Sequence, residues 1–182
     1  IFCRGGRTMR PVELLARAAD LIEEREGLLG LILCGPGEES LARDLEAKRC
    51  EETPSTAAAP LPLDLLKVAL ERAEFLITTD TGPRHIATAL GTPVVVLMGP
   101  TDPRYSASNL ERTVVLRRDV PCGPCHRKAC PFDHHRCLRE IPPEEVAEAA
   151  SRLHAAGRET ARRSGRPGEL DSSAGTGFRA GC

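Results

Sequence analysis

The six residues at positions 80–85 are the part of this sequence best suited to bind a phosphate. They are Asp80, Thr81, Gly82, Pro83, Arg84 and His85. Their side chains offer a carboxylate, a hydroxyl, a cation and an imidazole, and the glycine lets the backbone approach a ligand closely. Pro83 suits the first turn of a helix, where unpaired N–H groups and the positive end of the helix dipole attract anions. The alternative is that Asp80 or Thr81 only caps the helix and that His85 is structural.

Two strands are expected to position this loop, one before it and one after it. Residues 75–79 and 94–98 are apolar, β-branched runs without polar alternation, as is typical of parallel strands covered on both faces. A short helix over 85–90, ended by Gly91, should connect them. Open α/β sheets bind ligands at the carboxyl ends of their strands. We therefore expect Gly99 and Thr101, which follow the second strand, to contact the same ligand as the first loop.

The rest of the sequence alternates between segments with helix periodicity and short apolar segments. We expect helices over 11–26, 38–48, 64–72 and 144–154, strands over 30–34 and 113–116, and an irregular connection over 51–62. Asp64 is the expected cap of its helix. Hydrophobic periodicity stops at residue 157, so 157–182 is expected to be a disordered tail. Alternating strands and helices predict an α/β fold with a doubly wound parallel sheet.

An acidic pair follows the expected strand over 30–34. Glu38 and Glu39 come after the turn Gly35-Pro36-Gly37, and a carboxylate there could accept hydrogen bonds from ribose hydroxyls, as in related nucleotide-binding folds. The alternative is that both side chains only stabilise the start of a helix, by about 0.3–1 kcal/mol. The residues alone leave both interpretations open.

Composition and charge exclude several classes of protein. The chain carries 25 basic and 26 acidic residues among 182, a net charge of −1, so a global signature of nucleic-acid binding is absent. No apolar run approaches the ~20 residues of a membrane span, and we expect no signal peptide. Eight cysteines without such a signal favour a reducing compartment, the cytoplasm, over a disulfide scaffold.

Four of the cysteines fall in one segment, residues 121–138. Cys122, Cys125, Cys130 and Cys137 could supply four soft ligands to a tetrahedral zinc ion. Their spacing is irregular compared with two paired CxxC motifs, which favours reduced thiols or adventitious disulfides on a proline-rich loop. A structural zinc ion stays an open alternative.

These motifs together resemble one family of enzymes. The stretches DTGPRHIA at 80–87, ALGTPVV at 89–95 and GPT at 99–101 are similar to the signature of the lipopolysaccharide heptosyltransferases, glycosyltransferase family 9. The cysteine-rich segment and the IPPEEV that follows it also resemble a segment of many family members. Members usually carry methionine or leucine at the position of Arg84, and they have a tryptophan near the start of this region, whereas this chain has no tryptophan.

The resemblance implies one half of a GT-B glycosyltransferase, in which two Rossmann-like domains face each other. This chain resembles the carboxyl-terminal half, expected over 1–156, which binds the nucleotide-sugar donor. The implied reaction is inverting transfer of a heptose from ADP-heptose to the inner core of lipopolysaccharide, without a cofactor. The general base is expected in the other half, so no catalytic residue is assigned here and the chain is expected to be inactive alone.

The residues implied to bind the donor are those of 80–85, Glu38 or Glu39, Gly99 and Thr101. Arg7 or Arg10 could neutralise the diphosphate, or both could be solvated charges. The implied partners are the donor and, through the other half, the lipopolysaccharide core, with peripheral contact at the inner membrane as one option. The competing hypothesis is a cysteine-rich metal-binding or regulatory module without transferase activity. A nucleotide-sugar epimerase of similar build fits the loop less well.

Overall fold

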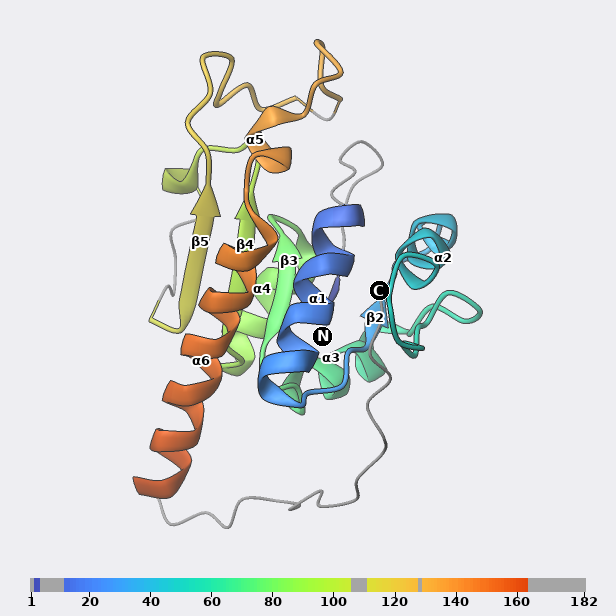
Figure 1. The fold of residues 1–182 in the computed structure, drawn as a ribbon, viewed down its shortest axis with the longest axis vertical. Coiled ribbons are helices and arrows are strands. Elements are labelled where there is room, and N and C mark those ends of the chain that lie inside the picture. Colours follow the sequence, from blue (N-terminus) through green and yellow to red (C-terminus); the bar gives the residue numbers. More distant parts are fainter. Residues whose placement is uncertain (1, 4–11, 106–110, 128, 164–182) are drawn as a thin grey trace.

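The described part of the chain, residues 2–3, 12–105, 111–127 and 129–163 of a computed structural model, folds around a five-stranded parallel sheet (Figure 1). Its strands are β1 (Phe2–Cys3), β2 (Ile32–Leu33), β3 (Leu76–Thr79), β4 (Val94–Met98) and β5 (Thr113–Arg117). Their spatial order is β2-β1-β3-β4-β5, and all neighbours pair in parallel. The predicted doubly wound α/β sheet is confirmed.

Helices cover both faces of this sheet (Figure 1). They are α1 (Val12–Glu26), α2 (Glu39–Glu46), α3 (Leu63–Glu71), α4 (Gly82–Leu90), α5 (Arg136–Arg139) and α6 (Pro143–Arg163), and a 3-10 turn, η1 (Pro103–Tyr105), follows β4. The helices α1, α2 and α6 share a buried cluster on one face, and α3 and α4 share another on the opposite face. Within the described ranges, no helix is both long and apolar enough to span a bilayer.

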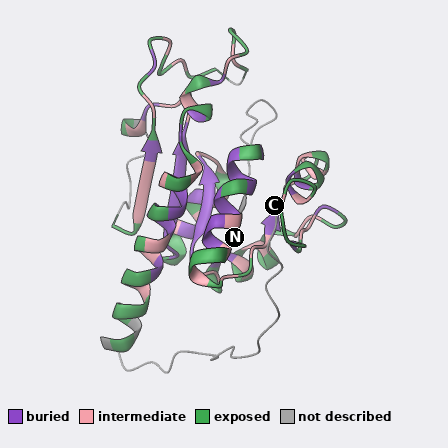
Figure 2. Cartoon of the chain, in the orientation of Figure 1, coloured by how far each residue is buried: buried purple, intermediate pink, exposed green. Residues whose placement is uncertain are grey.

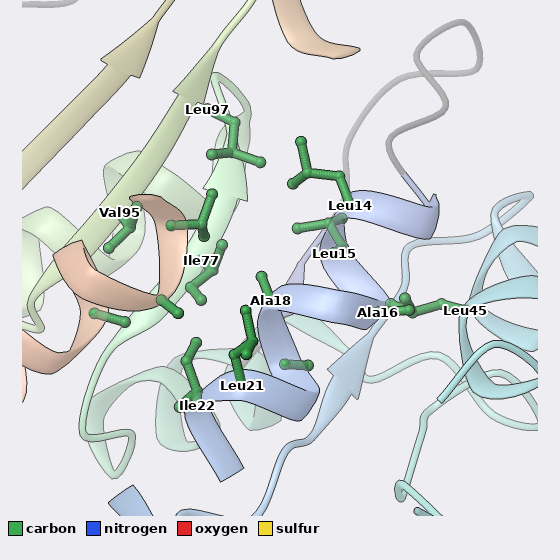
Figure 3. Close-up of a cluster of buried hydrophobic side chains, with 14 of the residues drawn as sticks. Leu14, Leu15, Ala16, Ala18, Leu21, Ile22, Leu45, Ile77, Val95 and Leu97 are labelled. Carbon is green, nitrogen blue, oxygen red and sulfur yellow. The ribbon is translucent and has the colours of Figure 1, made fainter. Parts of the chain in front are cut away.

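The side chains of β3 and β4 alternate between two hydrophobic clusters, which explains why their sequences lack polar alternation. Ile77, Val95 and Leu97 belong to the cluster that includes α1 and α6 (Figure 3). Leu76, Val94, Val96 and Met98 belong to the cluster that includes Leu70 of α3 and Ala87 of α4. The two strands are therefore buried along their whole length (Figure 2).

The strand order creates a switch point at the carboxyl ends of β1 and β3. The chain runs from β1 outward to β2 and then returns to form β3 on the other side of β1. Doubly wound sheets bind ligands where the order reverses in this way. The loop that follows β3 lies at this point. The loop that follows β1, including Arg7 and Arg10, lies outside the described residues.

The connection over 51–62 is irregular, as predicted, and it extends the sheet by a single bridge. Ser55 pairs in parallel with Ile32 of β2, at the edge that faces away from β1. Arg49 anchors the start of this connection. Its side chain is 1% exposed and contacts Asp20 of α1 at 2.9 Å and the hydroxyl of Thr53 at 2.8 Å.

Several elements differ from the sequence prediction at their ends. The N-cap of α3 is Pro62. Asp64, the predicted cap, lies inside the first turn of the helix. Helix α4 begins at Gly82 instead of residue 85. Helix α6 continues through Gly157 to Arg163, so residues 157–163 are helical and do not belong to a tail. Arginine, glutamate and alanine are strong helix formers and offset the one glycine. Residues 164–182 lie outside the described part.

Candidate functional site

The loop between β3 and α4 presents a helix amino terminus at the switch point. Thr81 is the N-cap residue, in an extended conformation with φ −144°, and it makes no side-chain capping bond. Its hydroxyl lies 3.2 Å from that of Thr78 and 3.4 Å from the carbonyl oxygen of Thr79. Thr81 therefore occupies the N-cap position without capping the helix through its side chain. At the other end, Gly91 closes α4 with φ 77°, as predicted.

Glycine at position 82 is not required by the protein itself. A Cβ atom built on Gly82 would meet no atom within 4 Å, and its φ is not among the positive values of the described glycines. Gly82 and His85 are exposed, while Thr81 and Pro83 are half-buried. The backbone of Gly82 is therefore open to a ligand that approaches the first turn of α4.

Arg84 does not face the solvent over this turn. It is only 2% exposed and forms an ion pair with the Oδ1 atom of Asp80, whose side chain is 14% exposed. The pair spans four residues, the spacing that brings side chains together along a helix. The sequence indicated a cation available to the ligand at Arg84, whereas the structure buries its side chain against a carboxylate of the same loop.

The carboxylates of Glu38 and Glu39 fold back onto the turn after β2. Glu38 accepts a hydrogen bond from the N–H of Gly35 at 3.2 Å, and Glu39 accepts one from Gly37 at 3.0 Å. The Gly37 N–H is the main cause that lowers the pKa of Glu39. Both residues are half-buried. β1 separates β2 from β3, so this turn lies about 10 Å from the β3 loop at the usual strand spacing.

The loop after β4 is braced by a buried acid. Asp102 is 5% exposed and accepts hydrogen bonds from the backbone N–H of Arg104 at 3.0 Å and from its guanidinium at 2.6 Å. These contacts lower the pKa of Asp102 from 3.8 to about 2. Thr101, which was expected to contact the ligand, points its hydroxyl at the sulfur of Met98, 3.0 Å away. Gly99 is half-buried beside it. The sequence carried a signal for this contact, because an acid precedes an arginine by two residues across a proline.

The cysteine-rich segment adjoins the β4 loop. The N–H of His126 donates a hydrogen bond to the carbonyl of Pro100 at 2.9 Å. Pro100 also helps to line a cavity of about 30 Å³ whose wall includes all four cysteines, Cys122, Cys125, Cys130 and Cys137. These contacts place the cysteine-rich segment against the loop at the carboxyl end of β4.

The cysteines of this cavity are free thiols and differ in their acidity. Burial, and then the neighbouring thiols, raise the pKa of Cys137. Backbone N–H groups, foremost that of His135, lower the pKa of Cys130. Among the residues whose placement is described, no three His, Cys, Asp or Glu side chains are arranged to hold a metal ion. The zinc alternative thus gains no support from the geometry.

The sequence of this chain is similar to those of bacterial heptosyltransferases. It is 35% identical over 81 residues to lipooligosaccharide heptosyltransferase 2 of Campylobacter jejuni, a match that covers 44% of this chain and 26% of that protein. It is 37% identical over 94 residues to lipopolysaccharide heptosyltransferase 1 of Pseudomonas aeruginosa, covering 48% of this chain and 26% of that protein. The chain therefore matches about a quarter of the length of these relatives.

The fold is similar to that of a solved enzyme. A family 9 glycosyltransferase from Veillonella parvula superimposes with a TM-score of 0.69 at 24% identity, over 85% of this chain and 46% of that one. The match over less than half of that protein agrees with one Rossmann-like half of a GT-B enzyme. Residues 19–136, more than half of the chain, match the sequence model of glycosyltransferase family 9 (heptosyltransferase). The chain belongs to glycosyltransferase family 9.

Proposed function

We propose that this chain binds ADP-heptose, as the donor-binding half of a heptosyltransferase that acts on the inner core of lipopolysaccharide. One observation carries the proposal: in a family 9 chain, the polar loop after β3 leads at the switch point into a helix whose amino terminus has no side-chain cap. A diphosphate would supply the negative charge that this terminus favours.

Gly82 supports the same assignment. Neither packing nor backbone geometry explains a glycine in the first turn of α4, whereas a ligand that approaches the backbone closely does. The turn that carries Glu38 and Glu39 lies two strand spacings from the β3 loop, about 10 Å, a span that the ribose of a nucleotide with its diphosphate on the α4 terminus can cover. The proposed donor-binding set also keeps Asp80, Thr81, Pro83 and His85, with Arg84 in the indirect role argued below, and Gly99 and Thr101 at the next strand end.

The mechanism that fits this site is direct displacement at the anomeric carbon, with inversion. As the sugar–phosphate bond breaks, negative charge grows on the departing diphosphate. The N–H groups and dipole at the start of α4 are already oriented to stabilise that charge, which is the electrostatic part of catalysis. The acceptor hydroxyl would be deprotonated by a base outside these residues, so we assign no catalytic residue within the chain.

Calorimetric titration of ADP and ADP-heptose against the purified chain tests the donor assignment. We expect both to bind, and adenosine to bind more weakly because it lacks the diphosphate. Thr81→Ala should weaken ADP, whereas Thr160→Ala, in an exposed turn of α6 far along the chain, should not. Equal affinity for ADP and adenosine would refute binding of the diphosphate at α4.

Transfer by this chain alone is not expected. General acid–base catalysis contributes about 10²–10⁴-fold, and acceptor positioning contributes more, and we place both in the acceptor-binding half. Incubation with ADP-heptose and a heptose-deficient lipopolysaccharide core should yield no product above the rate without protein. Turnover by the chain would contradict this division of roles. A cytoplasmic location, with peripheral contact at the inner membrane, follows from the same proposal because the donor is a nucleotide sugar.

The metal-binding module is the competing function, and metal analysis separates the two. We propose that neither a metal nor a cofactor takes part in donor binding. Elemental analysis of the purified chain should show less than one equivalent of zinc or iron, and a chelator should leave the affinity for ADP unchanged. One tightly held equivalent whose removal abolishes ADP binding would contradict this.

A further inference from the structure

The most deeply buried charged side chain of the proposed site is that of Arg84. Arg84 is 2% exposed, and its guanidinium contacts Asp80, the first residue after β3. A guanidinium is not removed from water without a compensating carboxylate, because an unpaired buried charge is strongly unfavourable. The pair as a whole carries no net charge.

Asp80 alone would oppose the binding of an anion. It lies one residue before the N-cap of α4, so its carboxylate is close to the terminus at which a diphosphate would bind. A single negative charge about 8 Å from an anion, at an effective dielectric constant of about 20–40, weakens binding by roughly tenfold. The helix dipole supplies only about half a charge of the opposite sign.

We infer that Arg84 is a positioning residue that neutralises and fixes the Asp80 carboxylate, so that the amino terminus of α4 can accept a diphosphate. Arg84 acts through Asp80 and does not itself touch the phosphates. Asp80 keeps hydrogen-bonding capacity toward a hydroxyl of the transferred sugar, which ADP lacks, because a carboxylate can accept bonds at both oxygens. This inference rests on the proposed function and deepens it, since it assigns the charge balance of the same site.

Three variants test the inference by the charge that each leaves beside α4. Arg84→Met removes the cation and leaves the carboxylate, so ADP should bind about tenfold more weakly in low salt. The double variant Asp80→Asn/Arg84→Met removes both charges, and its ADP affinity should return to within about threefold of the unaltered chain. Asp80→Asn alone leaves the buried guanidinium without its carboxylate, so we compare its ADP affinity with its adenosine affinity, and the ratio of the two should not fall below that of the unaltered chain.

Adenosine provides the control for a merely structural effect. Because adenosine has no charge, its affinity should differ by less than about threefold among the unaltered chain and all three variants. A variant that disturbs the fold would weaken adenosine and ADP alike. Arg84→Lys keeps the charge and should bind ADP nearly as well as the unaltered chain.

The outcomes that overturn the inference are distinct from those that overturn the proposed function. If the double variant binds ADP as weakly as Arg84→Met, Arg84 contacts the phosphate directly and the inference is wrong while donor binding stands. If Arg84→Met does not fold, the double variant decides, because it leaves no unpaired buried charge: ADP binding about tenfold weaker than that of the unaltered chain, with adenosine unchanged, refutes charge compensation. If the unaltered chain does not bind ADP, the proposed function and the inference both fail.

Discussion

Replacing Gly82 by alanine should separate stability from ligand binding. The new methyl group would meet no protein atom within 4 Å, and the backbone there is helical. Such a Gly→Ala change stabilises a protein by about 0.4–1 kcal/mol, because the unfolded chain loses conformational freedom. For a domain of this size the melting temperature should rise by about 1–3 °C.

The same methyl group should impair donor binding. It would occupy the open space over the first turn of α4, where we place the diphosphate, and would keep the phosphate oxygens from the backbone N–H groups. A loss of about 1.4 kcal/mol, or roughly tenfold in the affinity for ADP, is expected. Thermal denaturation followed by circular dichroism gives the first quantity and calorimetry gives the second.

Gly91 provides a matched control at the opposite end of the same helix. A Cβ atom there would also meet no atom within 4 Å, but the φ of 77° is left-handed, so Gly91→Ala should destabilise the chain by about 1 kcal/mol. Its ADP affinity should not change. If Gly82→Ala binds ADP as well as the unaltered chain does, the glycine is not explained by a ligand and the site assignment loses its support.

Two further predictions concern stability. Arg49→Met should lower the free energy of unfolding by about 3 kcal/mol, measured in urea, because it leaves the carboxylates of Asp20 and Glu23 without their buried cation. An effect below about 1 kcal/mol would show that these contacts are not stabilising. Asp102 has a folded-state pKa of about 2, below its ordinary 3.8, so its contribution to stability is present above about pH 4 and is lost as the pH falls through about 2. Asp102→Asn should therefore flatten the stability profile between those values, and an unchanged profile would contradict the assignment.

The sequence predicted the elements whose signals are local. The apolar runs that became β3 and β4, and the glycine that closes α4, were read correctly because a buried strand and a left-handed cap each restrict residue type directly. Strand β1 was missed because two residues carry no periodicity, and α5 was missed because four residues in a cysteine-rich segment do not show a helical face.

The candidate site was predictable in position but not in its internal contacts. Strand ends fix where the loops lie, and the switch point follows from the strand order. The pairing of Arg84 with Asp80 depends on burial, which the sequence does not report, although the four-residue spacing was visible. For Glu38 and Glu39 the residues left a ribose contact and a role at the start of the helix open, and both carboxylates accept bonds from their own turn. Local hydrogen bonds of this kind compete with ligand contacts and cannot be judged before the turn geometry is known.

Backbone amide chemical shifts during a titration with ADP-heptose would test the central claim most directly. The account predicts that the largest changes fall on the amides of Gly82, Arg84 and His85 at the start of α4, with smaller changes at the turn after β2. The amides of α6 beyond His154, remote from the strand ends, should not move. Changes confined to the cysteine-rich segment, or none at saturating donor, would contradict donor binding at the switch point.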